Sequence, residues 1–206
     1  MTEIKICGLF RDRDIDYVNE AGPDYAGFIL NYPPSRRNLS PARAGELQRR
    51  LRPEIKAVGV FVNETVEEVC RVSELVGLNV IQLHGQEDAE YIAALRKLWG
   101  RPIWKAFRVR SCEDLSRAEA SSADEILLDN GYGTGEAFDW SLAAGLHRPF
   151  LLAGGLTPEN IPQAIRELRP KLLDISSGVE TDGVKDREKI RAAVLAAHGK
   201  KKEGNP

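Results

Sequence analysis

The sequence has few of the features that mark secreted, membrane-spanning or nucleic-acid-binding proteins. Its 206 residues include three cysteines, Cys7, Cys70 and Cys112, an odd number without zinc-site spacing. That pattern argues against a disulfide framework and predicts no metal site. No stretch approaches the ~18 apolar residues of a membrane span. The formal net charge of −2 gives no sign of a nucleic-acid or membrane partner.

Length and composition are typical of one globular domain. Hydrophobic residues make up 42% and charged residues 29% of the chain, and its length suits a single sizeable core. The N-terminus runs directly into a strand-like segment, with no recognisable signal peptide. We therefore expect a cytoplasmic enzyme, with a domain over residues 1–199 and a disordered, charged tail over 200–206.

The clearest pattern lies near the C-terminus, where two apolar runs flank a helical segment. Residues 150–153 and 172–175 have the length of buried strands, and residues 157–168 have helical spacing. A strand, a helix and a second strand in this order predict a βαβ unit with parallel strands.

Glycine-rich turns follow both of these runs. Gly154-Gly155 ends the first and Ser177-Gly178 follows the second. Glycine lets the backbone approach a ligand closely, and backbone N–H groups at such turns bind anions. We expect these two turns to hold one phosphate, as the loops after strands seven and eight of a (β/α)8 barrel do.

The same alternation of strand and helix extends back to the N-terminus. Strands are expected over residues 4–8, 25–30, 55–62, 80–83, 103–109, 125–129, 150–153 and 172–175. Helices are expected over 12–21, 41–51, 64–76, 89–99, 112–120, 139–145, 157–168 and 185–198. Strict alternation calls for a parallel sheet. Eight equal units favour an α/β single-domain (β/α)8 TIM barrel over an open doubly wound sheet.

Catalytic groups of such a barrel lie at the C-terminal ends of its strands. This rule selects polar side chains, each of which also has a structural interpretation: Cys7, Arg36 or Arg37, Asn63, His84, Lys105 or Arg108, Asp129 and Asp174. A lone cysteine is often a small core residue, and His84 could cap its strand. Asp129 ends a buried run, where a carboxylate is costly unless it is paired or used. Asn63 and Lys105 are better explained as structural.

Taken together, the motifs resemble those of the phosphoribosylanthranilate isomerase family, barrel enzymes of tryptophan biosynthesis. The resemblance rests on KICG at 5–8, VGVFVN at 58–63, QLHG at 82–85, LLD at 127–129, GTG at 133–135, FDW at 138–140, AGGL at 153–156, PENI at 158–161, DISSGVE at 174–180 and GVKD at 183–186. Their order and spacing hold from residue 5 to about residue 190, which argues against a chance match.

The resemblance implies a reaction and two catalytic roles. N-(5'-phosphoribosyl)anthranilate would rearrange to 1-(2-carboxyphenylamino)-1-deoxyribulose 5-phosphate, an Amadori rearrangement that needs no cofactor. Cys7 would be the base that takes the C2′ proton, and Asp129 the acid that protonates the furanose oxygen. These roles require the pKa of Cys7 to fall below its usual ~8.5 and that of Asp129 to rise above ~3.9.

The resemblance also implies substrate contacts, with two departures from the family pattern. Arg37 falls on the family's carboxylate-binding arginine, but Arg36 replaces the usual proline and could act beside it or in its place. His84 would orient Cys7 or contact substrate, and Asp174 would contact the anthranilate amine. The loop after strand six is short and carries a tyrosine at a common glycine position.

Other functions stay open at this point. A different phosphosugar isomerase or epimerase is the nearest rival, although the imidazole-carboxamide isomerase has a carboxylate in place of Cys7 and the epimerases rely on metal-binding histidines. Indole-glycerol-phosphate synthase would need lysines and glutamates that the matching strands lack. A non-catalytic phosphosugar-binding barrel is the rival of another class. The expected partner is a phosphosugar, and the expected state a monomer or homodimer.

Overall fold

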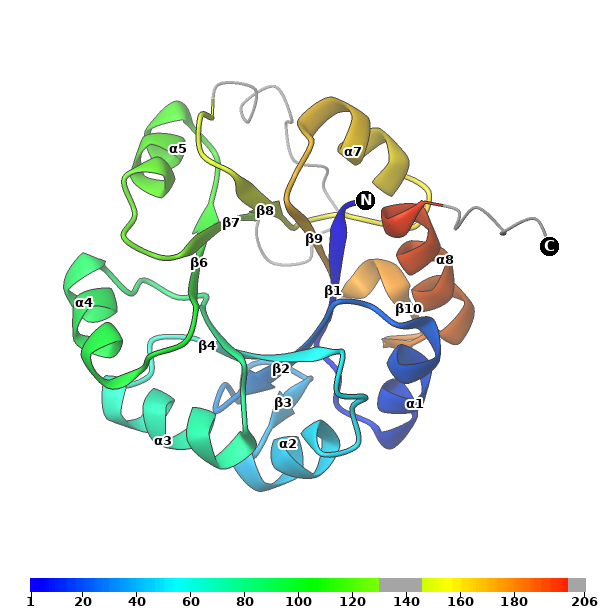
Figure 1. Ribbon diagram of the computed structural model, residues 1–206, viewed down its shortest axis with the longest axis horizontal. Helices are drawn as coiled ribbons and strands as arrows, with labels where there is room; N and C mark the ends of the chain where they lie inside the picture. The colour runs from blue at the N-terminus through cyan, green and yellow to red at the C-terminus, as the bar shows by residue number, and fades with distance from the viewer. Residues whose placement is uncertain (130–145, 200–206) are drawn as a thin grey trace.

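Eight parallel strands close into a barrel in the computed structural model, which describes residues 1–129 and 146–199. The strands are β1 (Glu3–Cys7), β2 (Tyr25–Leu30), β4 (Lys56–Phe61), β5 (Val80–Leu83), β6 (Ile103–Arg108), β7 (Glu125–Asp129), β8 (Phe150–Leu152) and β9 (Leu172–Ile175). Because β1 pairs with both β2 and β9, the sheet forms the ring seen in Figure 1. The predicted TIM barrel is confirmed.

Helices surround this ring (Figure 1). They are α1 (Asp12–Ala21), α2 (Pro41–Gln48), α3 (Val66–Val76), α4 (Ala89–Leu98), α5 (Cys112–Glu119), α7 (Ile161–Leu168) and α8 (Arg187–His198). Ser40 caps α2 by accepting a hydrogen bond from the backbone of Arg43. Gly77 ends α3 in the left-handed conformation. The helix expected over residues 139–145 and the tail lie outside the described residues.

Four small elements were not expected from the sequence. A short strand, β3 (Asn38–Leu39), pairs with β2, and a 3-10 turn, η1 (Ser177–Val179), follows β9. An antiparallel hairpin joins β10 (Glu180–Thr181) and β11 (Val184–Lys185). The expectation that helix α8 begins at residue 185 is therefore wrong.

The reason for this difference is an Asp-Gly turn. Asp182 and Gly183 have φ values of 50° and 79°, and positive φ at both positions is what a two-residue type I′ hairpin requires. The turn pairs Glu180 with Lys185, and α8 starts only after Asp186, whose side chain caps it. The Asp182-Gly183 dipeptide is therefore a sequence signal from which this hairpin could have been predicted.

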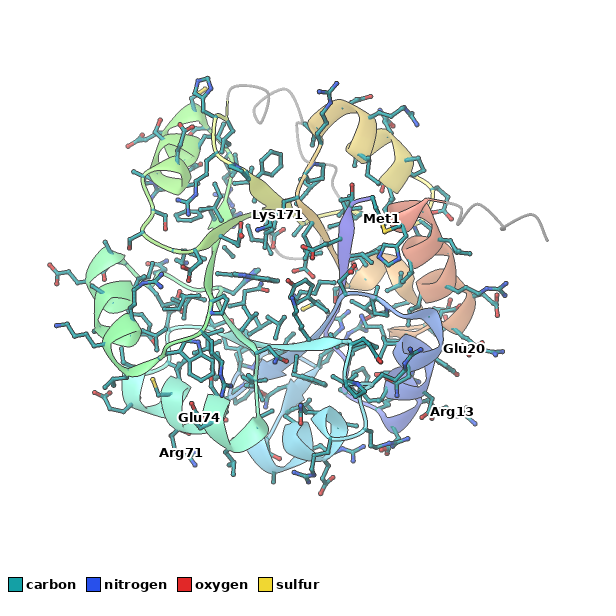
Figure 2. The ribbon with its side chains drawn as sticks, in the orientation of Figure 1. Met1, Arg13, Glu20, Arg71, Glu74 and Lys171 are labelled. Atoms are coloured by element: carbon teal, nitrogen blue, oxygen red, sulfur yellow. The ribbon has the colours of Figure 1, made fainter. Side chains whose placement is uncertain are left out.

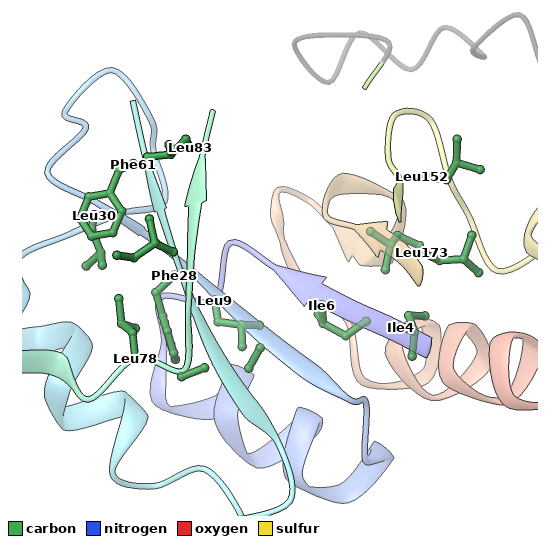
Figure 3. Close-up of a cluster of buried hydrophobic side chains, with 14 of the residues drawn as sticks. Ile4, Ile6, Leu9, Phe28, Leu30, Phe61, Leu78, Leu83, Leu152 and Leu173 are labelled. Atoms are coloured by element: carbon green, nitrogen blue, oxygen red, sulfur yellow. The ribbon is translucent and has the colours of Figure 1, made fainter. Parts of the chain in front are cut away.

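Two cores form on the two faces of the sheet. The larger lies between strands and helices; Figure 3 shows part of it, including Ile4, Phe28 and Leu173. The smaller fills the barrel interior with Tyr25, Val58, Val80, Trp104, Ala106, Leu127, Leu151, Ala153 and Leu172. Side chains alternate along a strand, so residues two positions further on also face inward: Gly27, Gln82, Asp129 and Asp174. The interior thus turns from apolar to polar toward the C-terminal ends of the strands.

Charged side chains cover the outside of the helices. Arg13 and Glu20 on α1, and Arg71 and Glu74 on α3, point away from the barrel (Figure 2). Across the described parts of the chain, no helix has both the length and the apolar character needed to cross a bilayer. The polar groups inside the barrel mouth are therefore separate from this solvated outer surface.

Candidate active site

Cys7 ends β1 at the barrel mouth, where it is 8% exposed. Its register partner on β2 is Gly27. A Cβ atom at Gly27 would lie 2.8 Å from the sulfur of Cys7, so the missing side chain makes room for the thiol. The residue that follows, Gly8, has a φ of 75° and turns the chain away from the barrel.

The charge state of this thiol differs from the expectation. Burial raises the pKa of Cys7 above its ordinary value, and the positive charges of Lys5 and Lys185 offset only part of that rise. The nearby carboxylate of Asp174 adds to it. The expected lowering of the Cys7 pKa is therefore wrong for the structure described here.

Beneath Cys7 lies a buried ion pair between Asp174, which the sequence selected, and Lys5, which it did not. The ammonium of Lys5 donates to both carboxylate oxygens of Asp174, at 3.0 and 2.9 Å. The side chain of Lys5 is fully buried and that of Asp174 is 7% exposed. A signal for Lys5 did exist, because a lysine inside a buried strand is costly unless it is paired.

His84 lies beside the predicted acid rather than beside Cys7. Its Nε2 is 3.2 Å from Oδ2 of Asp129, at the end of β7. Its Nδ1 is 3.0 Å from the amide nitrogen of Gln82. The imidazole therefore bridges the side chains of Gln82 and Asp129. The interpretation that His84 orients Cys7 is not supported. Asp129 as the acid stays a prediction.

The two arginines after β2 converge on Glu180, which sequence reasoning also missed. Arg37 donates to it through Nε and Nη2, at 2.7 and 2.6 Å. Arg36 donates through Nη2 at 2.7 Å, and Lys185 through Nζ at 2.8 Å. Burial favours the neutral acid, but the hydrogen bonds and charges of Arg37 and Lys185 outweigh it, so the pKa of Glu180 falls below its ordinary value.

Arg37 and Arg36 nevertheless occupy different positions. The side chain of Arg37 is 16% exposed and that of Arg36 is 58% exposed. The Cδ of Arg37 packs over Gly8, where an added Cβ would be only 2.5 Å away. Arg37 therefore lies next to Cys7 at the mouth, and Arg36 lies at the rim.

The two predicted phosphate loops lie side by side. Gly154 and Gly155 have φ values of 87° and 64°, a conformation that favours glycine. A Cβ atom at Gly178 would overlap the carbonyl oxygen of Leu156, so the loops after β8 and β9 touch there. The side chain of Asn160 donates to the carbonyl of Gly155 at 2.9 Å and steadies the first loop. The adjacency is confirmed, and phosphate binding stays a prediction.

Asn63 and Lys105 have structural roles, as expected. Lys105 donates to the carbonyl of Gly85 at 2.8 Å and pairs with Glu87 at 3.2 Å. Glu87 also accepts the backbone N–H groups of Asn63 and Gly85, at 2.7 and 2.9 Å. These contacts fix the loop that carries His84. In the described part of the chain, no group of three or more His, Cys, Asp or Glu side chains could hold a metal ion.

The arrangement suits proton transfer at two separate points of one small molecule. Cys7 and Asp129 face the mouth from β1 and β7, which β8 and β9 separate in the ring. Arg37 and the two glycine-rich loops after β8 and β9 lie at the same end of the barrel. Such a mouth could bind a molecule with a carboxylate at one end and a phosphate at the other.

Comparison with known proteins gives a consistent result. The family model described as N-(5'phosphoribosyl)anthranilate (PRA) isomerase matches residues 4–196. Proteins named N-(5'-phosphoribosyl)anthranilate isomerase from Acetivibrio thermocellus and Dechloromonas aromatica are each 46% identical, with 95% of both chains covered in each case.

Solved structures agree with the sequence relatives. Phosphoribosyl anthranilate isomerase from Thermotoga maritima is 39% identical, with 97% of this chain and 100% of that one covered, at a TM-score of 0.89. A phosphoribosyl anthranilate isomerase in complex with reduced 1-(o-carboxyphenylamino)-1-deoxyribulose 5-phosphate is 38% identical, with the same coverage and a TM-score of 0.87.

Proposed function

The chain belongs to the N-(5'-phosphoribosyl)anthranilate isomerase family, and from that premise we propose that Cys7 and Asp129 are the base and the acid of its reaction. The protein is an intramolecular isomerase that acts on N-(5'-phosphoribosyl)anthranilate in tryptophan biosynthesis. One observation supports the two roles above all: both side chains face the barrel mouth, each beside a different ionisable partner, Lys5 and His84.

Asp129 acts first in the proposed sequence. Its carboxyl group gives a proton to the furanose ring oxygen, the bond from that oxygen to C1′ breaks, and the anthranilate nitrogen becomes an iminium. His84, whose Nε2 lies 3.2 Å from Oδ2, holds this carboxyl group in place. Cys7, as the thiolate, then removes the proton from C2′, and the electron pair of that bond neutralises the iminium to give an enolamine. Tautomerisation to the ketone completes the isomerisation without a redox change.

Arg37 is the proposed partner of the anthranilate carboxylate. Glu180 occupies the Nε–Nη2 edge of its guanidinium, and a guanidinium has five N–H donors. The Nη1–Nη2 edge can therefore bind a second carboxylate bidentately. Arg36, which is more exposed, adds positive charge at the rim.

The phosphate is the second anchor of the substrate. We place it between the backbone N–H groups of Gly154, Gly155, Ser177 and Gly178, where the two loops touch. We place the reaction in the cytoplasm, in a monomer or a homodimer. The description of a Thermotoga maritima relative as dimeric supports the second state.

Substrate turnover in three variants tests the proposed roles. Freshly generated N-(5'-phosphoribosyl)anthranilate would be followed by its fluorescence with wild type, Cys7→Ser and Asp129→Asn. Loss of a general base or acid is expected to slow turnover by about 100-fold or more in each. Cys112→Ser, the same change at an exposed cysteine, is the matched control and should keep full activity. Full activity in Cys7→Ser would reject the assigned base, and tight binding of a product analogue without wild-type turnover would favour a non-catalytic barrel.

A further inference from the structure

We propose that Lys5 and Asp174 form a positioning pair for Cys7. The ammonium of Lys5 stabilises the thiolate, and Asp174 acts by holding Lys5 rather than by contacting the substrate. This inference rests on the proposed role of Cys7 as the base. It assigns Lys5 a function in the reaction and replaces the substrate contact expected for Asp174.

The first support is the stacking of Lys5 and Cys7 on one face of β1. They are two residues apart, so both side chains face the barrel interior. A Cβ atom added to Gly27 would lie 2.8 Å from both the Cys7 sulfur and the Lys5 Cε. The end of the lysine and the thiol therefore lie over the same glycine.

The second support is the fixed position of the ammonium. Lys5 and Asp174 are register partners across β1 and β9. The Lys5 nitrogen is 3.0 and 2.9 Å from the two oxygens of Asp174. An ammonium has three N–H donors, so two directed at Asp174 leave the third for Cys7. With both oxygens engaged and 7% exposure, Asp174 is better placed to hold Lys5 than to meet a ligand.

The third support is the sign of each charge that acts on Cys7. The charges with the largest effect on it are Lys5 on β1, Asp174 on β9 and Lys185 on β11. Arg37 also lies close by, over Gly8, with its guanidinium paired to Glu180. Lys185 is occupied by Glu180 and by the carbonyl of Ser176. Of these charges Lys5 has the largest effect in favour of the thiolate, and Asp174 opposes it. Removing Lys5 should raise the pKa of Cys7, and removing the charge of Asp174 should lower it.

These opposite signs separate the proposal from its rivals. A substrate-binding Asp174 would alter KM and leave the thiol of the free protein unchanged. A purely structural ion pair would alter stability and leave the pH dependence of the reaction unchanged. The proposal requires both the free thiol and the pH dependence of turnover to respond.

The test is a titration of the Cys7 thiol in the full chain without substrate. Ultraviolet thiolate absorbance would be measured against pH in a Cys70→Ser/Cys112→Ser background, with a Cys7→Ser blank to subtract tyrosine ionisation. Lys5→Met is expected to raise the pKa of Cys7 by about one or more, a tenfold or larger loss of thiolate. Asp174→Asn should lower that pKa, and Lys5→Arg should leave it near the wild-type value.

Turnover supplies the second readout. The acid limb of the kcat/KM profile should move to higher pH in Lys5→Met, with kcat falling about tenfold or more and KM changing less. Lys5→Met leaves the buried carboxylate of Asp174 without its partner, which destabilises the fold. The double variant Lys5→Met/Asp174→Asn has no charge at either position and avoids this cost. It should still show a raised thiol pKa.

The opposing outcomes are distinct. Unchanged thiol titrations in Asp174→Asn and in the double variant, with a higher KM alone, would overturn the proposal in favour of substrate contact. If Cys7→Ser kept full activity, the base assignment would fail, while the titrations would still decide whether Lys5 and Asp174 control the thiol.

Discussion

Each of the two proposed catalytic side chains has an ionisable neighbour. Cys7 has the ammonium of Lys5, and Asp129 has the imidazole of His84. The space for the first of these pairs comes from Gly27 on the next strand. At the scale of residues, the absence of a side chain at Gly27 is therefore as important for the site as the presence of the thiol.

Gly27→Ala tests this point. The new Cβ would lie 2.8 Å from the Cys7 sulfur and the Lys5 Cε, and 3.1 Å from the Cys7 Cα. Since this Cα belongs to the backbone, the strand itself must shift, and we expect kcat to fall about 100-fold and stability to fall by about 1–3 kcal/mol. Gly100→Ala, where nothing lies within 4 Å, is the matched control for activity and for urea midpoint. Equal behaviour of the two variants would contradict this explanation.

Sequence reasoning reached some of these residues and not others. Cys7 and Asp129 are identifiable because they end buried strands. Lys5 is harder to recognise, because its partner Asp174 lies 169 residues away and becomes a neighbour only when β1 and β9 pair. The direction of the Cys7 pKa shift could not be predicted from the sequence either, because burial and charges on separate elements determine it together.

At the scale of elements, the hairpin of β10 and β11 connects the arginines at the mouth to the end of β1. Glu180 receives hydrogen bonds from Arg36, Arg37 and Lys185, and Lys185 also donates to the carbonyl of Ser176 at 2.9 Å. Ser176 in turn donates to the carbonyl of Cys7 at 3.1 Å. The hairpin thus holds the arginines and the end of β1 together.

Glu180→Gln tests the energetic role of the hairpin. The pKa of Glu180 is lowered in the folded protein, so the ionised group stabilises the fold above the usual glutamate pKa of ~4.3, and that contribution disappears as pH falls through the lowered value. Breaking this buried pair should reduce the free energy of unfolding by about 3 kcal/mol at pH 7. Urea unfolding at several pH values should show the difference shrinking below pH ~4.3.

The control for that measurement is Glu188→Gln, at an exposed position on α8. It should change stability by no more than about 0.5 kcal/mol. A Glu180→Gln deficit that stays constant down to acid pH would show that ionisation of Glu180 is not the source of the stability.

The loops after β8 and β9 form a second functional element. Gly178→Ala would place a Cβ atom on the carbonyl oxygen of Leu156 and force the two loops apart. Loss of charge-assisted hydrogen bonds to phosphate should raise KM about tenfold or more, with a smaller effect on kcat. Inorganic phosphate should also inhibit this variant less than wild type. An unchanged KM would place the phosphate elsewhere.

Most elements were predictable because periodicity and capping agree with the fold. Strands β2, β5, β7 and β9 have the expected bounds, and Ser40 and Gly77 cap their helices with residue types that are typical of those positions. The hairpin was missed because the helical pattern of α8 was extended back through Lys185. Helix α7 starts at Ile161 rather than at residue 157, because Asn160 and Thr157 form a turn before it.

At the scale of the whole molecule, ring closure brings the ends of the chain together at the site. Pairing of β1 with both β2 and β9 places Cys7 beside the loop after β9, although 169 residues separate Cys7 from Ser176 in sequence. Helix α8 returns to the start of the chain, where the N–H of Thr2 donates to the carbonyl of Ala197 at 3.3 Å. The strict strand–helix alternation predicted this closure, whereas the contacts across the mouth depend on register and could not be predicted.

The most direct measurement is the isotope effect of deuterium at C2′ in single turnovers of wild type, Cys7→Ser and Asp129→Asn. If Cys7 removes the C2′ proton, its loss makes cleavage of that bond slower than ring opening, so the isotope effect should be larger in Cys7→Ser than in wild type. Loss of the acid slows the earlier ring opening, so the effect should be smaller in Asp129→Asn. An isotope effect that is unchanged in Cys7→Ser, or that grows in Asp129→Asn, would contradict the division of roles between these two residues.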